Sequence, residues 1–264
     1  VRNLISHGLK GLYVTNRTFE KAVKLAEAFK GTPIMFYERV EYLANIDILV
    51  RGDGEEIVEE IARGRPLPEI AGISYRLDGR FEHNPVRQCG PARGDLYPDR
   101  GLRRYSYAVD QGGLRGRSFD TLASSRGCPY NCTFCSFSRN PWGGKRAWTA
   151  RSPESVVREI GEIDADVVLF VDDNFTHDPD RVAAICDLLL ASGIRKRYVA
   201  NARVEIARRP DVLRKMERAG FSMLLLGIES AQDKTLRSMR KGFGTEKLRE
   251  YFRVLRRSRM LLLG

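Results

Sequence analysis

Three cysteines lie within eight positions of the chain, in the stretch SRGCPYNCTFCSF. Three residues separate Cys128 from Cys132, and two separate Cys132 from Cys135. Thiolates are soft ligands that hold zinc or iron–sulfur clusters, and clustered cysteines fit such chemistry better than a secreted disulfide framework. The group supplies three ligands, so one position of a tetrahedral ion, or one corner of a four-iron cluster, is left without a cysteine.

The rest of the chain offers no well-placed fourth ligand. It contains five cysteines and three histidines, and His177 is the only histidine after His83. Cys89 falls in an irregular connector, and Cys186 falls in an apolar helical segment where a small core side chain is the ordinary interpretation. Two hypotheses follow: an iron–sulfur cluster whose open corner binds a cofactor or substrate, and a structural zinc knuckle.

The spacing of Cys128, Cys132 and Cys135 resembles that of the radical S-adenosylmethionine (SAM) superfamily, and the resemblance covers roughly residues 106 to 264. In that family the three cysteines bind three irons of a [4Fe–4S] cluster, and SAM chelates the fourth. One electron from the cluster cleaves SAM to methionine and a deoxyadenosyl radical, which abstracts hydrogen from the substrate. The resemblance implies both cofactors, and it implies that Phe134 lies against the adenine.

Apolar strands alternate with amphipathic helices from about residue 118 onward. The expected strands lie in FDTLASS, DVVLFVDDN, YVANARVE, SMLLLGIES and MLLLG, and the expected helices include SPESVVREIGEI, DPDRVAAICDLLLAS and PDVLRKMERAG. Ser152 and Pro153 are typical of the first turn of a helix. This alternation predicts an α/β fold with a parallel sheet, a partial (β/α) barrel of radical SAM type. Too few units are present to close an eight-unit barrel, so we expect an open or truncated one.

Polar residues follow several of these strands, where the active residues of a β/α barrel lie. The family resemblance implies that Glu229, in LLLGIES, contacts SAM. By the same analogy Asp172 meets the SAM amino group, and Arg203 pairs with its carboxylate. Each residue also has a structural interpretation, because a charged group that ends a buried strand is often a helix cap or a salt-bridge partner.

The sequence predicts three regions: a Rossmann-like α/β fragment at 1–50, a connector at 51–117 and the partial barrel at 118–264. In the connector, GDGEEIVEEIARG predicts a short acidic helix, and Asp78-Gly79 between two short strands predicts a hairpin. The stretch NPVRQCGPARGDLYPDRGLRRY has no periodicity, and we interpret it as a surface connector.

The first region, GLKGLYVTNRTFEKAVKLAEAFKG, resembles part of the NADPH-binding domain of glutamyl-tRNA reductase. The resemblance implies that Asn16, Arg17 and Thr18 meet the ribose phosphate of the cofactor. The glycine-rich phosphate loop that precedes this segment in such domains is missing, which counts against a working dinucleotide site.

The segment from Ile48 to Gln88 resembles the end of the cobalamin-binding domain, and its linker, in B12-binding radical SAM proteins. That group includes methyltransferases and the anaerobic magnesium-protoporphyrin monomethyl ester cyclase, so the resemblance implies methyl transfer or cyclisation. The Asp-x-His-x-x-Gly pattern that ligates cobalt does not occur in these residues. This departure counts against cobalamin as a third cofactor.

The formal net charge of +11 comes mostly from arginines spread over the expected helices, without a basic block. We therefore expect a small-molecule substrate and a one-electron donor such as flavodoxin or ferredoxin, and no nucleic acid. No apolar run approaches the ~18 residues of a membrane span. The start of the chain lacks Met and also lacks the features of a secretory signal, so we expect a cytoplasmic protein.

Three alternative functions remain open. A tRNA-modifying methylthiotransferase shares the cysteine spacing but requires a second cluster. A non-catalytic NADPH-binding fragment of the glutamyl-tRNA reductase type would depend on the first region alone. A zinc-stabilised binding module would use the same three cysteines without SAM.

Overall fold

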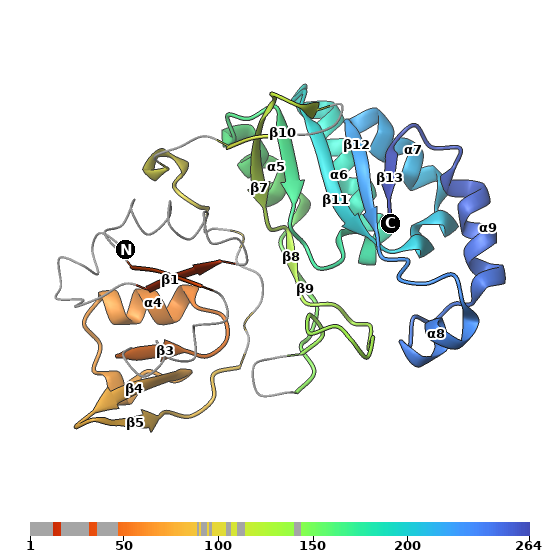
Figure 1. Ribbon diagram of the computed structural model, residues 1–264. Helices are drawn as coiled ribbons and strands as arrows, with labels where there is room; N and C mark the ends of the chain where they lie inside the picture. Colours follow the sequence, from red (N-terminus) through yellow and green to blue (C-terminus); the bar gives the residue numbers. More distant parts are fainter. Residues whose placement is uncertain are drawn as a thin grey trace. The chain divides into compact units, whose positions relative to one another are not determined.

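The computed structural model describes residues 47–88, 90, 94, 97–103, 107–109, 114–139 and 144–264, and the backbone of 13–16 and 32–35. The chain divides into two compact units, Val1–Gly90 and Pro91–Gly264, which are drawn in Figure 1. No helix in the described ranges is long and apolar enough to cross a membrane.

The described residues of the first unit form two small sheets and one helix. Its elements are β1 (Tyr13–Asn16), β2 (Thr32–Met35), β3 (Ile48–Val50), α4 (Glu55–Ala62), a 3₁₀ turn (Leu67–Glu69), β4 (Ile73–Leu77) and β5 (Arg80–His83). β1 and β2 are parallel, whereas β3, β4 and β5 form an antiparallel sheet, so β3 does not extend the β1–β2 pair. The acidic helix and the hairpin are confirmed. Asp78 and Gly79 both have positive φ, as a type I′ turn requires.

Residues 17–31, which include Arg17 and Thr18, lie outside the described residues. A small core, made of Ile57, Ile70, Ile73 and Tyr75, lies between α4 and the antiparallel sheet.

The second unit is built on a six-stranded sheet. Its strands are β6 (Tyr107–Ala108), β7 (Ser118–Leu122), β10 (Val167–Phe170), β11 (Arg197–Ala202), β12 (Phe221–Leu226) and β13 (Leu261–Leu263). Their order is β13-β12-β11-β10-β7-β6, and every pairing is parallel except that of β6 with β7. The predicted parallel sheet is confirmed, and it is open at β13.

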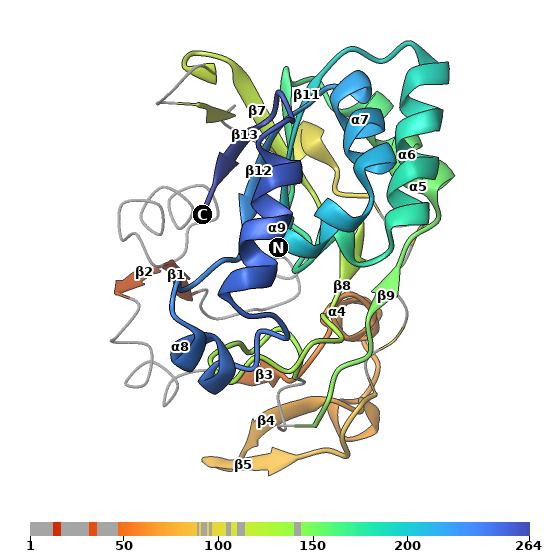
Figure 2. The ribbon, with the colours of Figure 1, turned by 90° about the vertical axis from the view of Figure 1, so that its right-hand side faces the viewer.

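Helices cover one face of this sheet (Figures 1 and 2). They include α5 (Pro153–Glu162), α6 (Pro179–Ser192) and α7 (Pro210–Ala219). The unit also contains α8 (Asp233–Ser238) and α9 (Thr245–Leu255), with 3₁₀ turns at Arg100–Leu102, Phe175–His177 and Val204–Arg208. Ser152 caps α5 as predicted, because its side chain accepts a hydrogen bond from the Ser155 N–H. The large core between helices and sheet includes the stacked rings of Phe170 and Phe221, and Cys186 is fully buried there.

The cysteine-bearing segment leaves the sheet after β7. Two short strands, β8 (Ser125–Arg126) and β9 (Thr149–Ala150), pair antiparallel and enclose residues 127–148, which we call the cysteine loop. Figure 1 shows β8 and β9 beyond the carboxyl ends of the parallel strands. The fold therefore places the three cysteines at the edge where a β/α barrel carries its active residues.

Candidate active site

The cysteine loop holds three free, partly buried thiols. They belong to Cys128, Cys132 and Cys135, and the Cys135 N–H donates to the Cys132 carbonyl at 3.2 Å. Gly127 begins the loop with φ of +81°, and a Cβ there would stand 2.6 Å from the Ala147 carbonyl oxygen. Only glycine fits this position without strain, because the backbone is left-handed and closely approached.

The three cysteines supply three thiol ligands. A structural zinc site requires four ligands around one ion. In a [4Fe–4S] cluster each cysteine binds a different iron, so three cysteines leave the fourth iron open. The donor set therefore fits a cluster better than a zinc knuckle.

Two consecutive aspartates anchor the start of the loop to the end of β10. The carboxylate of Asp172 accepts hydrogen bonds from the Ser124 N–H at 3.0 Å, from the Ser124 hydroxyl at 2.7 Å and from the Ser125 hydroxyl. The carboxylate of Asp173 accepts from the Gly127 N–H at 2.8 Å. These bonds fix the backbone immediately before Cys128.

Asp172 is fully buried. Burial raises the pKa of its carboxyl above the ordinary value, and the serine hydrogen bonds oppose that rise. The structure thus gives Asp172 several partners beneath the loop. Its predicted contact with the SAM amino group is not tested and stays a prediction.

Arg203, which follows β11, lies against the loop from the side. Its guanidinium carbon is 3.7 Å from the centroid of the Tyr130 ring, and its Nη1 is 3.7 Å from the Cys132 sulfur. Glu205 accepts from Nε and Nη2, and the Lys241 carbonyl also accepts from Nη2. Arg203 is therefore in contact with the cysteine loop. Its predicted pairing with the SAM carboxylate also stays a prediction.

Lys241 contacts both Glu229 and Phe134, an aromatic residue of the cysteine loop. Its ammonium donates to Glu229 Oε1 at 3.1 Å, and it lies 5.9 Å from the ring centroid of Phe134. The lysine side chain is 3% exposed, whereas the glutamate is 32% exposed and Phe134 is 54% exposed. Glu229 itself adopts a left-handed backbone with φ of +66°. A strained residue held by a buried partner at a strand end is typical of a functional site.

The C-terminal end of α8 is hydrogen-bonded to the middle of the cysteine loop. The Thr133 N–H donates to the Met239 carbonyl at 3.2 Å, and the Thr133 hydroxyl donates to the Ser238 carbonyl at 3.2 Å. Because Thr133 lies between Cys132 and Cys135, this contact fixes the second half of the cysteine spacing.

An aromatic cluster lies beside the loop at Tyr130. The His177 ring is 4.7 Å from Trp148 and 6.3 Å from Tyr130, measured between centroids, and both contacts are edge-on. Burial lowers the pKa of His177 below the ordinary value of a histidine. His177 is a packing residue in the 3₁₀ turn Phe175–His177.

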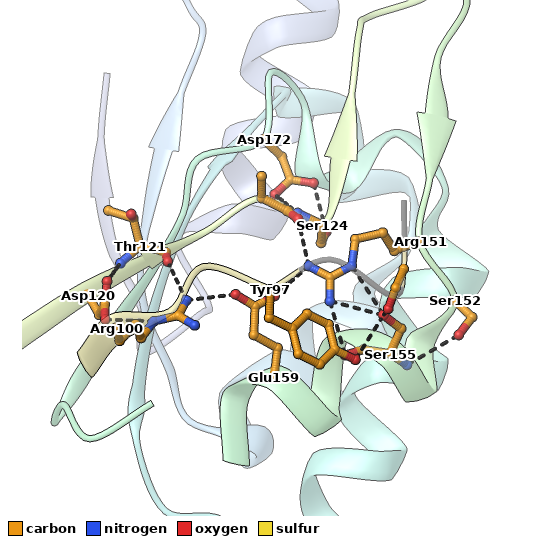
Figure 3. A network of polar contacts seen from close by, with 12 residues as sticks. Tyr97, Arg100, Asp120, Thr121, Ser124, Arg151, Ser152, Ser155, Glu159 and Asp172 are labelled. Carbon is orange, nitrogen blue, oxygen red and sulfur yellow. Dashed lines mark hydrogen bonds and ion pairs between the residues drawn. The ribbon is translucent and has the colours of Figure 1, made fainter. Parts of the chain in front are cut away.

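A network of buried polar groups supports the segment that leads into the loop (Figure 3). Arg151 donates to the Ala123 carbonyl at 3.1 Å and pairs with Glu159 at 2.5 Å. Arg181 donates to the Ser124 carbonyl at 2.9 Å and to the Arg151 carbonyl at 3.0 Å. The backbone before the cysteines is thus held by two arginines in addition to Asp172.

The same network reaches the stretch that the sequence presents as a surface connector. Arg100 pairs with Asp120 at 2.8 Å and with Glu159 at 2.7 Å, and its side chain is only 14% exposed. Arg103 pairs with the other oxygen of Asp120 at 2.7 Å. The expectation of a surface connector is wrong at Arg100, because two buried carboxylates, on β7 and α5, require a cation there.

The structure gathers the predicted residues around one loop, with different partners. Phe134 and Glu229 are joined through Lys241, Arg203 contacts Cys132, and Asp172 lies beneath the loop. The sequence does not single out Lys241, because nothing distinguishes it from the other 44 lysines and arginines of the chain.

The comparisons with known proteins agree with this site. The model of the radical SAM superfamily matches residues 122–261, which is more than half of the chain. The chain therefore belongs to the radical SAM superfamily, and the predicted family is confirmed.

Two curated relatives are similar over most of this chain. An uncharacterized methyltransferase of Pyrococcus horikoshii is 32% identical over 212 residues, which cover 75% of this chain and 43% of that protein. The anaerobic magnesium-protoporphyrin IX monomethyl ester cyclase of Synechocystis sp. is 30% identical over 245 residues, which cover 87% of this chain and 46% of the cyclase. The chain thus spans less than half the length of either relative.

Solved structures support the same fold. The cobalamin-dependent SAM radical enzyme OxsB, in its apo form, matches 99% of this chain and 41% of its own, with a TM-score of 0.69 at 20% identity. This likeness confirms the partial barrel of radical SAM type as the fold class.

The beginning of the chain has different relatives. The shikimate / quinate 5-dehydrogenase family matches residues 1–59. Glutamyl-tRNA reductase of Geobacter metallireducens is 40% identical over 83 residues, which cover 29% of this chain and 19% of that protein. The predicted resemblance of the first region is confirmed.

Proposed function

We propose that this chain is the catalytic portion of a radical SAM enzyme. Cys128, Cys132 and Cys135 would hold a [4Fe–4S] cluster and leave its fourth iron to SAM. When bound, the cluster supplies the electron that cleaves SAM reductively and so generates the radical that abstracts hydrogen from the substrate. The observation that carries the proposal is the cysteine loop of a radical SAM family member, held at the carboxyl ends of a parallel sheet by β10, β11 and α8.

The residues around the loop divide into two kinds. Phe134 and Glu229 are partly exposed beside the cysteines, and we assign them to contact with SAM. Asp172 and Arg203 are buried against the loop. Each orients the cysteines, and contact with SAM is a further role that we propose for them.

The reaction that best fits the relatives is methyl transfer or cyclisation on a small organic substrate. One relative is a methyltransferase and another is a cyclase. We extend the OxsB likeness to cobalamin only as a cofactor to be tested, since the cobalt-ligating pattern is missing from the sequence. A small one-electron donor of the flavodoxin or ferredoxin type would reduce the cluster.

We propose that the reaction takes place in the cytoplasm and that the chain has three functional regions. Free cysteines at Cys128, Cys132, Cys135 and Cys186 fit a reducing compartment. The regions proposed are a reductase-like fragment at 1–50, a connector at 51–117 and the catalytic barrel at 118–264.

Anaerobic reconstitution with iron and sulfide tests the proposal. About four irons per chain are expected for one cluster, and about eight would favour a two-cluster methylthiotransferase. With dithionite and SAM, the reconstituted chain should release methionine and 5′-deoxyadenosine, with and without cobalamin. Stoichiometric zinc without a brown chromophore would contradict the proposal and would establish a zinc module.

A further inference from the structure

Arg203 uses its guanidinium in a way that the proposed function does not require. The Nε edge and Nη2 bind Glu205, and Nη2 also donates to the Lys241 carbonyl. The flat face covers the Tyr130 ring. With those groups occupied, Nη1 points at Cys132 and lies 3.7 Å from its sulfur, a distance that an N–H···S bond spans because sulfur is larger than oxygen.

The guanidinium remains charged in this setting. An arginine side chain stays protonated in proteins, and the Glu205 carboxylate pairs with this one at 2.6 Å. Arg203 is 8% exposed, so little water screens its charge from the nearby sulfur. The residue therefore presents a permanent cation and an N–H donor to one of the three thiols.

We propose that Arg203 donates an N–H···S hydrogen bond to Cys132 and thereby raises the reduction potential of the cluster on this loop. The inference rests on the proposed function, because it requires the cluster. Reduction adds one electron, taken from an external donor, and leaves the cluster and its thiolates with one more negative charge. A hydrogen bond and a cation at a cluster sulfur stabilise the reduced form more than the oxidised form.

The surroundings explain why an arginine occupies this position. A planar guanidinium binds Glu205 along one edge, stacks on Tyr130 with its face and still aims a third nitrogen at Cys132. A lysine ammonium is a point charge without a face or a fork, so it cannot make all three contacts. The stacking and the Glu205 pair fix the direction of the N–H, which a flexible cation would not.

The test is a redox titration of the reconstituted full chain, without SAM, followed by the electron paramagnetic resonance (EPR) signal of the reduced cluster. Arg203→Gln should shift the midpoint potential to a more negative value, and Arg203→Lys should give an intermediate value. Arg208→Gln is the matched control, because exposed Arg208 follows the same strand and donates to the Tyr251 hydroxyl. It should leave the midpoint unchanged. An unchanged midpoint in Arg203→Gln with full iron content would overturn the inference.

A second measurement does not depend on the stability of any variant. In the parent chain grown with arginine labelled at its guanidino nitrogens with ¹⁵N, pulsed EPR of the reduced cluster should show a weak ¹⁵N coupling. Failure to detect the coupling in a chain that holds its cluster would overturn the inference and leave the proposed function intact. Failure of the parent to form any cluster would instead overturn the proposed function.

Discussion

Glu159 is the carboxylate on which the support of the cysteine loop depends, and Glu159→Gln tests that dependence. Its side chain is 1% exposed and pairs with Arg151 and Arg100, whose side chains are 6% and 14% exposed. The amide of glutamine keeps one acceptor oxygen but turns an NH₂ group toward the other guanidinium. Arg100 retains Asp120 as a carboxylate partner, whereas Arg151 has no other salt-bridge partner among the described groups.

The expected loss of stability follows from these contacts. One charge-assisted hydrogen bond is lost outright, which costs about 1.5–3 kcal/mol. The buried Arg151 charge is left without its counterion, and breaking such a pair costs about 3–5 kcal/mol in all. Because the remaining amide oxygen still accepts one bond, we expect the free energy of unfolding to fall by about 3 kcal/mol. For a unit of this size that corresponds to a decrease in Tm of about 6–12 °C.

Urea denaturation followed by circular dichroism measures this effect. Glu162→Gln is the control, because Glu162 is exposed on the same helix, and it should change stability by less than about 0.5 kcal/mol. Glu159→Gln should also reduce the iron retained after reconstitution, since Arg151 holds the Ala123 carbonyl before the loop. A loss of stability below about 1 kcal/mol would refute the reasoning, because removing one partner of a buried ion pair costs about 3–5 kcal/mol.

Three further predictions concern the loop and its surroundings. Gly127→Ala places a Cβ 2.6 Å from the Ala147 oxygen and should cost about 1–3 kcal/mol with loss of bound iron; unchanged iron content would contradict the close approach. Lys241→Met should weaken SAM binding about tenfold while the cluster stays intact, because Glu229 loses its ammonium partner. Equilibrium dialysis measures the binding, and Lys241→Arg should retain it. Parent-like SAM binding by Lys241→Met would refute the role of Lys241 in orienting Glu229. Burial holds the pKa of His177 below 6.5, so unfolding takes up a proton and the free energy of unfolding falls as the pH drops below about 6.5. His177→Gln should reduce this pH dependence, which urea denaturation at several pH values measures. An unchanged pH dependence in the variant would contradict the prediction.

Local patterns predicted the elements that position the site. Ser152 and Pro153 begin α5, and Asp78-Gly79 turns the hairpin, because each depends on backbone preferences within a few residues. The parallel sheet followed from apolar strands alternating with helices. The antiparallel β6 was not expected, because Tyr107–Ala108 is too short to show a period.

The partners of the site residues could not be predicted, because they come from distant parts of the chain. The sequence places Asp172 and Asp173 together at the end of one strand. It does not show that one binds Ser124 and Ser125 while the other binds Gly127. Successive residues of an extended chain point in opposite directions, but what each meets depends on the tertiary fold.

The central claim is that Cys128, Cys132 and Cys135 hold a four-iron cluster whose remaining iron is open to SAM. The most direct measurement is pulsed EPR of the reduced, oxygen-free protein with SAM labelled with ¹⁵N at its amino group. The account predicts a changed spectrum and a ¹⁵N coupling in the parent and in Cys186→Ala, since Cys186 is buried in the core, and no cluster signal in Cys132→Ala. A parent spectrum that is identical with and without SAM, or equal loss of signal in both variants, would contradict it.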